Sequence, residues 1–307
     1  FFLFLFFPFL LHAQEYLFPV KPGNRNLLSG NFSEIRPNHF HSGIDVKIGG
    51  VDGEPVLAIS DGYVYRIKIS SFGYGNIIYL KHTNGQSSVY AHLRNLSPKI
   101  MEFMRKEMYF AQKNELEVFP DPEFLPIKKG EIIGNGGNTG SSGGPHLHFE
   151  IRDTTSEKII NPMYFGFDSV IADSKRPILN SLFVYPLDQN SIVNQSKRPI
   201  AVSISQQIDG SYIAEKVLAN GKIGFGITTF DYDDVSWNAN GIFRVQTFLN
   251  GRTDFSYKFD TFAFDETRYI NALIDYGRYK KLGQRVQKLF AENPYPLSII
   301  ESGTNSG

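Results

Sequence analysis

Two short segments of the chain contain the residue types of a metal site. They are residues 41–45, with the sequence HSGID, and residues 144–150, with the sequence GPHLHFE. Three of the seven histidines of the chain lie in these segments. Two histidines and a carboxylate are a common ligand set for a catalytic zinc ion, which keeps a further position for water or substrate. We therefore expect both segments to contribute to one metal site.

The spacing of these residues suggests different tasks for the two neighbouring histidines. Residues two apart in a strand face the same way, so His146 and His148 are expected to project together. One can bind the metal while the other acts as an acid or base. Gly43 allows the first segment to bend, so that both of its ends reach one ion. His92, in the sequence YAHL, ends a predicted strand, and beside the other motifs it becomes a candidate catalytic base.

Composition sets broad limits. The 307 residues are enough for two domains, and 41% hydrophobic content indicates a globular chain. The 31 basic residues balance the 31 acidic residues, so no basic field attracts nucleic acid. The 28 glycines and the 14% aromatic content favour strands and tight turns. Cysteine is absent, which by itself does not identify the cellular compartment.

The N-terminus predicts export. Residues 1–11, FFLFLFFPFLL, have the length of the apolar region of a signal peptide and are too short to span a membrane. We predict a signal peptide over residues 1–13 that lacks its basic start, with Ala13 before the cleavage point. The alternative is a buried strand. No other stretch is long enough to cross a bilayer.

The chain from residue 15 to residue 167 is predicted to form an antiparallel β domain of barrel or sandwich type. Short strands are expected at residues 55–60, 63–69, 76–82, 87–92, 129–134 and 146–152, separated by turns such as Asn84-Gly85. A short amphipathic helix is expected from Pro98 to about Lys113, with Ser97 as its N-cap. This helix belongs to a predicted insertion at about residues 97–126.

A linker is expected at residues 168–178, followed by a smaller β-sandwich of immunoglobulin-like type over residues 179–307. Its strands are expected at residues 179–185, 199–205, 222–230 and 242–264, with a helical excursion at residues 265–276. The last residues show no stop signal, which is compatible with a truncated domain. Asp231, Asp233 and Asp234, with two asparagines that follow, do not have the spacing of a calcium-binding EF-hand loop, so a solvated turn is expected there.

The motifs HxGxD, YAHL and GNTGSSGGPHLHFE, in this order, resemble the lysostaphin/LytM-type zinc endopeptidases that cut peptidoglycan peptides. Connecting pieces at residues 61–64, 73–76, 129–134 and 160–162 also match, and the resemblance extends roughly over residues 22–165. It implies that His41, Asp45 and His148 bind Zn²⁺ and that His92 and His146 are the paired catalytic histidines. Arg36 matches a position that is often arginine in the family.

This assignment agrees with zinc chemistry. Zinc lowers the pKa of a bound water to about 7 and polarises the scissile carbonyl, but proton transfers still need an acid and a base. No HExxH helix is present to supply a glutamate base, and a histidine pair has pKa values near neutrality. Two departures from the family stand out: the insertion of some thirty residues, expected either to flank the groove or only to pack, and the lack of a tyrosine shortly before His41.

The resemblance implies an exported metallopeptidase of the periplasm or cell envelope that cleaves peptide cross-links of peptidoglycan. The second domain would position the enzyme or bind an envelope protein. The first alternative is a catalytically silent relative that binds the cell wall or activates another wall hydrolase. The second is an iron oxygenase with two histidines and one carboxylate, but its first histidine and acid are usually one residue apart, whereas three residues separate His41 and Asp45.

Overall fold

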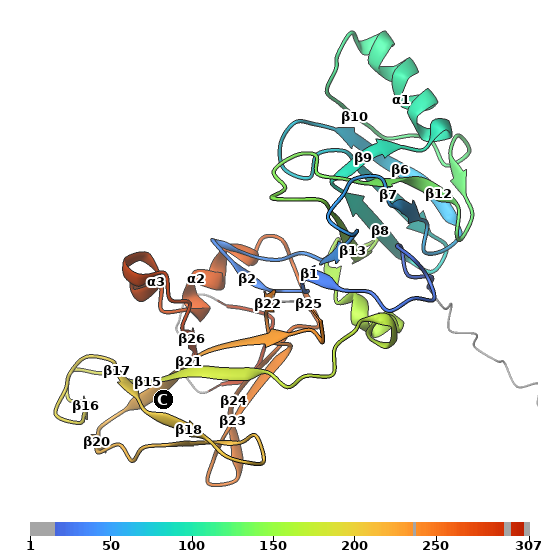
Figure 1. Ribbon diagram of the computed structural model, residues 1–307. Coiled ribbons are helices and arrows are strands. Elements are labelled where there is room, and N and C mark those ends of the chain that lie inside the picture. The colour runs from blue at the N-terminus through green and yellow to red at the C-terminus, as the bar shows by residue number, and fades with distance from the viewer. Residues whose placement is uncertain (1–15, 236–237, 292–295, 304–307) are drawn as a thin grey trace, which may run out of the picture.

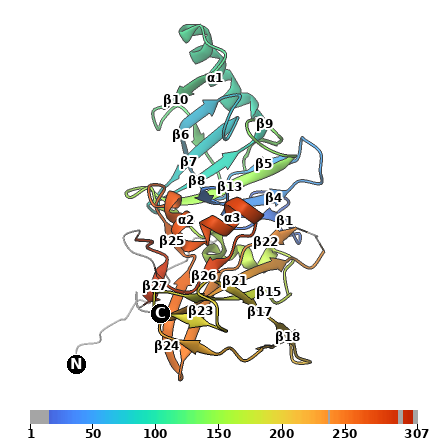
Figure 2. The ribbon, with the colours of Figure 1, turned by 90° about the vertical axis from the view of Figure 1, so that its left-hand side faces the viewer.

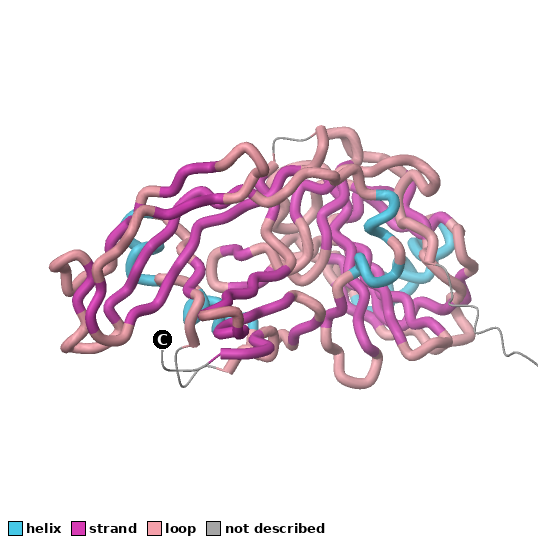
Figure 3. The backbone as a smooth tube through the Cα atoms, turned by 90° about the horizontal axis from the view of Figure 1, so that it is seen from below, coloured by secondary structure: helices cyan, strands magenta, loops and turns pink. Residues whose placement is uncertain are grey.

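The computed structural model describes residues 16–235, 238–291 and 296–303. The predicted signal peptide, residues 1–13, lies outside the described residues. The protein is mainly β, and strands and loops make up most of both halves of the molecule (Figure 3). No helix among the described residues has the length and apolar character needed to cross a membrane.

The first half is built on an antiparallel sheet, as expected from the alternating sequence pattern. Its strand order is β1-β4-β13-β8-β7-β6-β10, and β11 and β14 pair with β6 and β13. A second sheet has the order β5-β12-β9, and β2 and β3 form a separate hairpin. The strands are β1 (Leu28–Gly30), β2 (Ile35–Arg36), β3 (His39–Phe40), β4 (Ile44–Lys47), β5 (Pro55–Leu57), β6 (Gly62–Ile69), β7 (Ile77–His82), β8 (Gln86–Ala91), β9 (Leu93–Leu96), β10 (Leu116–Val118), β11 (Pro126–Ile127), β12 (Ile132–Gly136), β13 (His146–Asp153) and β14 (Ile159–Ile160).

Along two central strands, apolar side chains of the core alternate with polar side chains on the opposite face of the sheet. Ile44 and Val46 of β4 and Leu147 and Phe149 of β13 are fully buried in the hydrophobic core. The residues between them therefore point to the opposite face of the sheet. Because β4 and β13 pair antiparallel with Asp45 opposite His148, this second face brings the two sequence motifs together.

The inserted segment contains the predicted helix, α1 (Pro98–Ala111). Ser97 is its N-cap residue, although the Ser97 side chain makes no capping hydrogen bond, and Gln112 ends the helix in the left-handed conformation. Ile100 and Met104 anchor the helix in the core. Figures 1 and 2 place α1 at the end of the molecule that lies away from the second half.

The second half contains a five-stranded sheet with the order β17-β15-β21-β22, to which β26 adds by pairing with β21, and a three-stranded sheet with the order β23-β24-β27. Two further pairs are β16 with β20 and β18 with β19. The strands are β15 (Ile178–Pro186), β16 (Ile192–Val193), β17 (Ile200–Val202), β18 (Ile204–Gln206), β19 (Tyr212–Ala214), β20 (Ala219–Asn220), β21 (Ile223–Tyr232), β22 (Ala239–Asn240), β23 (Arg244–Leu249), β24 (Arg252–Lys258), β25 (Thr261–Phe262), β26 (Gln287–Lys288) and β27 (Ile300–Gly303). The helices outside the insertion are η1 (Pro162–Phe165), η2 (Phe167–Val170), η3 (Thr267–Tyr269), α2 (Ile270–Leu273) and α3 (Tyr276–Leu282).

The two halves share a hydrophobic core. Strand β25 pairs with β14 and so extends the sheet of the first half. Phe262 of β25 packs against Phe32 and Phe40, with ring centroids 5.4 and 5.5 Å apart. The same core includes Phe255 and Tyr257 of β24. The division into two domains at residues 168–178 stays a prediction, and the structure shows an extensive apolar contact across it.

The acidic segment at the end of β21 is partly buried and is not the solvated turn expected from its sequence. Asp233 and Asn240 are only 1% and 7% exposed, because Gly241 beside them exchanges two hydrogen bonds with Asn31 of the first half. Asp231, Asp233 and Asn240 line a cavity of about 390 Å³. The carboxylates of Asp231 and Asp233 do not converge with other side chains as metal ligands. Among the described residues, that arrangement occurs only in the cluster of His41, Asp45 and His148.

Asp231 is expected to lower stability at neutral pH. Burial and the nearby Asp173 carboxylate raise the pKa of Asp231 to about 6, so its ionised form is less favourable in the folded chain than in the unfolded chain. The resulting loss of folding free energy is absent at pH values below the pKa of Asp231 in the unfolded chain, and it is complete above the pKa of Asp231 in the folded chain. Asp231→Asn should therefore raise the free energy of unfolding by about 1 kcal/mol near pH 7.5, a value reduced by solvent screening.

Urea denaturation of both proteins near pH 7.5 and near pH 4 measures this difference. The gain should shrink toward pH 4, where Asp231 is mostly protonated when folded. An equal gain at both pH values would show that the Asp231 charge is not its cause. The Asp231 side chain accepts a hydrogen bond from the Tyr232 backbone N–H, and the asparagine oxygen can accept it in the same way.

Candidate metal centre

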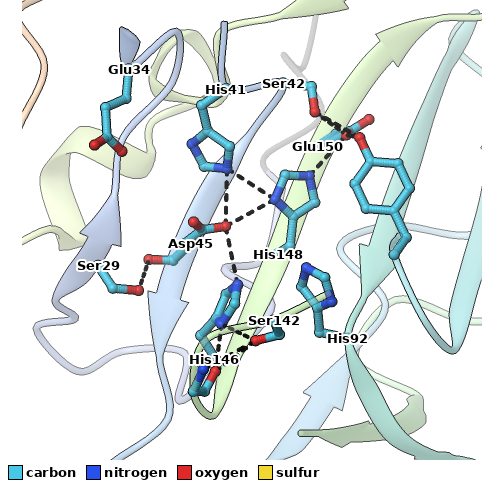
Figure 4. A network of polar contacts seen from close by, with 12 residues as sticks. Ser29, Glu34, His41, Ser42, Asp45, His92, Ser142, His146, His148 and Glu150 are labelled. Carbon is cyan, nitrogen blue, oxygen red and sulfur yellow. Dashed lines mark hydrogen bonds and ion pairs between the residues drawn. The ribbon is translucent and has the colours of Figure 1, made fainter. Parts of the chain in front are cut away.

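His41, Asp45 and His148 form one buried cluster, as the sequence motifs predict. His41 Nε2 lies 3.0 Å from Asp45 Oδ1 and 3.0 Å from His148 Nδ1, and His148 Nδ1 lies 2.9 Å from Asp45 Oδ1 (Figure 4). The three residues are 2%, 5% and 3% exposed. Around a tetrahedral zinc ion with bonds of 2.0–2.2 Å, neighbouring ligand atoms lie roughly 3.3–3.6 Å apart. The donor types therefore fit zinc. The separations fit once the three ligand atoms move apart by a few tenths of an ångström.

Strand pairing and one glycine bring these three residues together. Asp45 lies opposite His148 in the β4–β13 pair, while His41 precedes β4 and must turn back over it. Gly43 lies between His41 and Asp45, where a Cβ atom would stand 2.2 Å from the Phe149 carbonyl oxygen. A larger residue would force the two strands apart. Gly43 therefore allows close backbone contact with β13, in addition to the bend expected from the sequence.

Arg36 fixes the orientation of the Asp45 carboxylate. Its Nη2 atom donates to Asp45 Oδ2 at 2.5 Å and to Glu34 Oε2 at 3.2 Å. Oδ1, the other carboxylate oxygen, faces the two histidines. Burial alone would raise the pKa of Asp45, but the surrounding histidines, first of all His41, hold it well below its usual range. Asp45 is therefore held as a carboxylate, the form that a metal requires.

A buried carboxylate forms a hydrogen bond with the nitrogen of His148 that faces away from the cluster. Glu150 is 0% exposed, and its Oε1 atom lies 2.9 Å from His148 Nε2. Arg152 donates to Oε2 from Nη2 at 2.5 Å and from Nε at 2.7 Å. Burial opposes the ionisation of Glu150, but Arg152 and His148 bring its pKa far below the usual range. Hydrogen bonds of this kind fix the ring orientation of metal-bound histidines.

Two hydroxyl groups complete this carboxylate site. The Ser42 and Tyr74 hydroxyls donate to Glu150 Oε1 at 2.6 and 2.7 Å. Burial would lower the pKa of His148, but Asp45 and Glu150 raise it to about 9. Metal binding must displace any proton on Nδ1, so the affinity of the site for metal should fall at low pH. The sequence pattern did not point to Glu150, although its period-two spacing after His146 and His148 was a usable signal.

His92 and His146 lie side by side next to the cluster of His41, Asp45 and His148. Their ring centroids are 4.8 Å apart, and His146 Nε2 lies 3.4 Å from Asp45 Oδ1. His92 Nδ1 lies 2.8 Å from the Thr139 carbonyl oxygen, and His146 Nδ1 lies 2.8 Å from the Gly144 carbonyl oxygen. Donation by both Nδ1–H groups leaves both Nε2 atoms able to accept a proton.

The backbone at His92 is unusual. Its φ angle is +59°, in the left-handed region that residues other than glycine rarely adopt. This conformation ends β8 (Gln86–Ala91) and begins β9 (Leu93–Leu96) at the site. Burial and the neighbouring His148 lower the pKa of His92 to about 4. Local backbone strain of this kind often accompanies functional sites.

An open groove of about 780 Å³ leads to the cluster. Asp45, His92 and His146 line it, together with the loop of residues 141–145 and Asn238 of the second half. No residue of the insertion at 97–126 lines this groove, so the helix lies away from it. His39 is exposed and His82 bonds to Ser88 and to the Asp61 carbonyl oxygen. Both therefore stay outside the cluster, as expected.

Residues 39–118 match the model of peptidase family M23. The matched stretch includes His41, Asp45 and His92, while His146 and His148 lie beyond it. This part of the chain is thus similar to the M23 metallopeptidases, and it carries a buried cluster of two histidines and one carboxylate that could hold a metal ion.

Known proteins resemble this part of the chain. The DD-carboxypeptidase/endopeptidase Mpg of Neisseria meningitidis serogroup B is 38% identical over 113 residues, 37% of this chain and 20% of that protein. The murein hydrolase activator NlpD of Escherichia coli K12 is 31% identical over 125 residues, 41% of this chain and 26% of that protein. The catalytic domain of the antimicrobial peptidase lysostaphin from Staphylococcus simulans is 27% identical, with a TM-score of 0.33, covering 44% of this chain and 87% of that domain. The chain thus spans roughly a fifth to a quarter of these two curated relatives.

Proposed function

We propose that this protein is a zinc endopeptidase that hydrolyses peptide cross-links of bacterial peptidoglycan in the periplasm or cell envelope. The observation that carries the proposal is the position of the cluster of His41, Asp45 and His148 beside the groove that Asp45, His92 and His146 line. Relatives named as a DD-carboxypeptidase/endopeptidase and as a murein hydrolase activator support peptidoglycan as the substrate.

Different groups of the site would perform the separate tasks of hydrolysis. Zinc held by His41, Asp45 and His148 would supply a Lewis acid that polarises the scissile carbonyl and acidifies water. A base must take the proton of the attacking water and an acid must protonate the leaving amine. His92 and His146 can provide these functions because both Nε2 atoms are free of backbone partners in the tautomers that their Nδ1 contacts favour.

Removal of either catalytic histidine should separate chemistry from metal binding. In His92→Ala and in His146→Ala, we expect kcat to fall by about 100- to 10 000-fold, the usual contribution of a general acid or base. The zinc content should stay at the wild-type value because the three ligands remain. Mass spectrometry of defined cross-linked muropeptides would measure cleavage, and elemental analysis would measure zinc. Wild-type cleavage rates in both variants would contradict the proposed roles.

The alternative is a catalytically silent protein that activates another wall hydrolase, as the name of the relative NlpD suggests for that protein. Retention of all three ligand residues and of both histidines favours catalysis. Cleavage of purified muropeptides by the protein alone, lost on zinc removal and restored by added zinc, would support the enzyme. Absence of cleavage, together with stimulation of a partner hydrolase, would favour the activator.

A further inference from the structure

The groove beside the metal cluster is rich in positive charge. Four basic side chains line it, whereas Asp45 is the one carboxylate among its lining residues in the described part of the chain. The four basic residues are Lys21, Arg25, Arg36 and Lys47. A groove with this balance favours a ligand that carries negative charge.

Three of these four charges are already neutralised by carboxylates. The pairs are Lys21 with Glu54 at 3.2 Å, Arg25 with Asp234 at 3.1 Å, and Arg36 with Asp45 at 2.5 Å. Lys47 differs, because its Nζ atom donates to the neutral amide oxygen of Asn238 at 3.0 Å. Among the described residues, no carboxylate lies within ion-pairing distance of Lys47. Among the four basic side chains of the groove, its charge is thus the one left for the carboxylate of a bound ligand.

The position of Lys47 relates this charge to the reacting groups. Lys47 lies directly opposite His146 in the β4–β13 pair, and side chains of such pairs lie on one face with Cβ atoms about 5 Å apart. Asp45, two residues earlier on β4, faces the same way and ligates the proposed metal. The amide of Asn238, from the second half of the chain, holds the ammonium group at the groove wall.

We propose that Lys47 is a specificity-determining residue that binds a free carboxylate of the peptide substrate, one or two residues from the scissile bond. This inference rests on the proposed function and adds the substrate class, namely peptides with an anionic group near the cleaved bond. Peptides that are uncharged or amidated at that position are poorer substrates. The carboxylate is either the C-terminal group of a stem peptide or the side group of an acidic residue, and Lys47 recognises the charge that both share.

The test compares three cross-linked peptides of one sequence: with all carboxylates free, with the C-terminal carboxylates amidated, and with the side-group carboxylates amidated. Wild-type protein should lose about 10-fold in kcat/KM on one amidated peptide, as expected for one hydrogen bond between charged groups, and the affected peptide identifies the source. Lys47→Met should lose a similar factor on the free peptide and no longer discriminate. Lys47→Arg should retain a preference, and Lys113→Met, outside the groove, should behave as wild type.

A binding experiment separates this inference from the proposed catalysis. In His148→Ala protein, affinities for the same fluorescently labelled peptides report recognition without cleavage. Weaker binding of one amidated peptide, abolished by adding Lys47→Met, would support the role of Lys47 even if the protein proved catalytically silent. Equal binding of all three peptides, absence of binding, or equal losses on every peptide in Lys47→Met would overturn it.

Discussion

Replacement of His148 by alanine is expected to remove zinc binding and peptide hydrolysis together. The imidazole contributes Nδ1 to the cluster with His41 and Asp45, and two protein ligands are too few for a stable catalytic zinc site. We expect zinc affinity to fall by more than about 100-fold, since even the loss of a supporting hydrogen bond costs 10- to 100-fold. Hydrolysis should fall by at least about 1000-fold, because the Lewis acid is lost.

Elemental analysis of the purified protein and muropeptide digestion would measure the two effects. His39→Ala is the matched control, because the His39 side chain is exposed and bonds to the nearby Pro37 carbonyl oxygen. It should keep both zinc and activity. A His148→Ala protein that still cleaved muropeptides at the wild-type rate would disprove the proposed centre. Zinc retained without cleavage would instead assign His148 to the chemistry and call for another ligand.

Glu150→Ala is expected to have the largest effect on stability. Glu150 is 0% exposed and accepts hydrogen bonds from Arg152, Ser42 and Tyr74. Its removal leaves the guanidinium of Arg152 buried and without its closest partner, which typically costs 3–5 kcal/mol. We expect a loss of about 3 kcal/mol in the free energy of unfolding, because Glu157 and the Phe264 ring still contact Arg152.

The same change should weaken zinc binding by about 10- to 100-fold, because Glu150 orients His148 through Nε2. Glu150→Gln is the matched variant, since it keeps the shape and the acceptor oxygen but removes the charge. Denaturant unfolding and competitive zinc titration would measure both effects. If Glu150→Ala unfolded with wild-type stability, the buried ion pair would not have the role assigned to it.

The pH dependence of these variants has a definite sign. The pKa of Glu150 in the folded protein lies below its usual value of 4.5. A depressed pKa stabilises the folded state above the unfolded pKa, and this contribution is lost as the pH falls. The stability difference between wild type and Glu150→Gln should therefore be greatest near neutrality and should shrink below about pH 4.5. A difference that grew on acidification would contradict the ion-pair explanation.

Local sequence patterns predicted much of the first half. Alternation identified β6, β7, β8 and β13, and the Asn84-Gly85 turn lies between β7 and β8. Helical spacing after Ser97 predicted α1 to within two residues of its end at Ala111. These features could be read because strand and helix periodicities are properties of neighbouring residues. The same patterns in the second half located β15 and β21, while the range expected to be extended at residues 242–264 contains the two strands β23 and β24.

Contacts between distant segments could not be predicted in this way. The shared core between Phe32 and Phe262 joins residues of both halves, and the burial of Asp233 depends on that packing. Asn238 lies at the groove, where its side chain bonds to Lys47 and to the Ser29 carbonyl oxygen. Sequence spacing carries no information on such contacts, since they depend on how separately formed sheets pack against each other.

The sequence by itself determined which residues could hold a metal, because histidine and aspartate at these spacings have a definite donor chemistry. It also determined that His146 and His148 share one face of a strand. The tertiary structure decided which partners surround them: Arg36 on Asp45, Glu150 behind His148, and Lys47 opposite His146. The physical reason is strand register, because the pairing of β4 with β13 sets which side chains meet across the sheet.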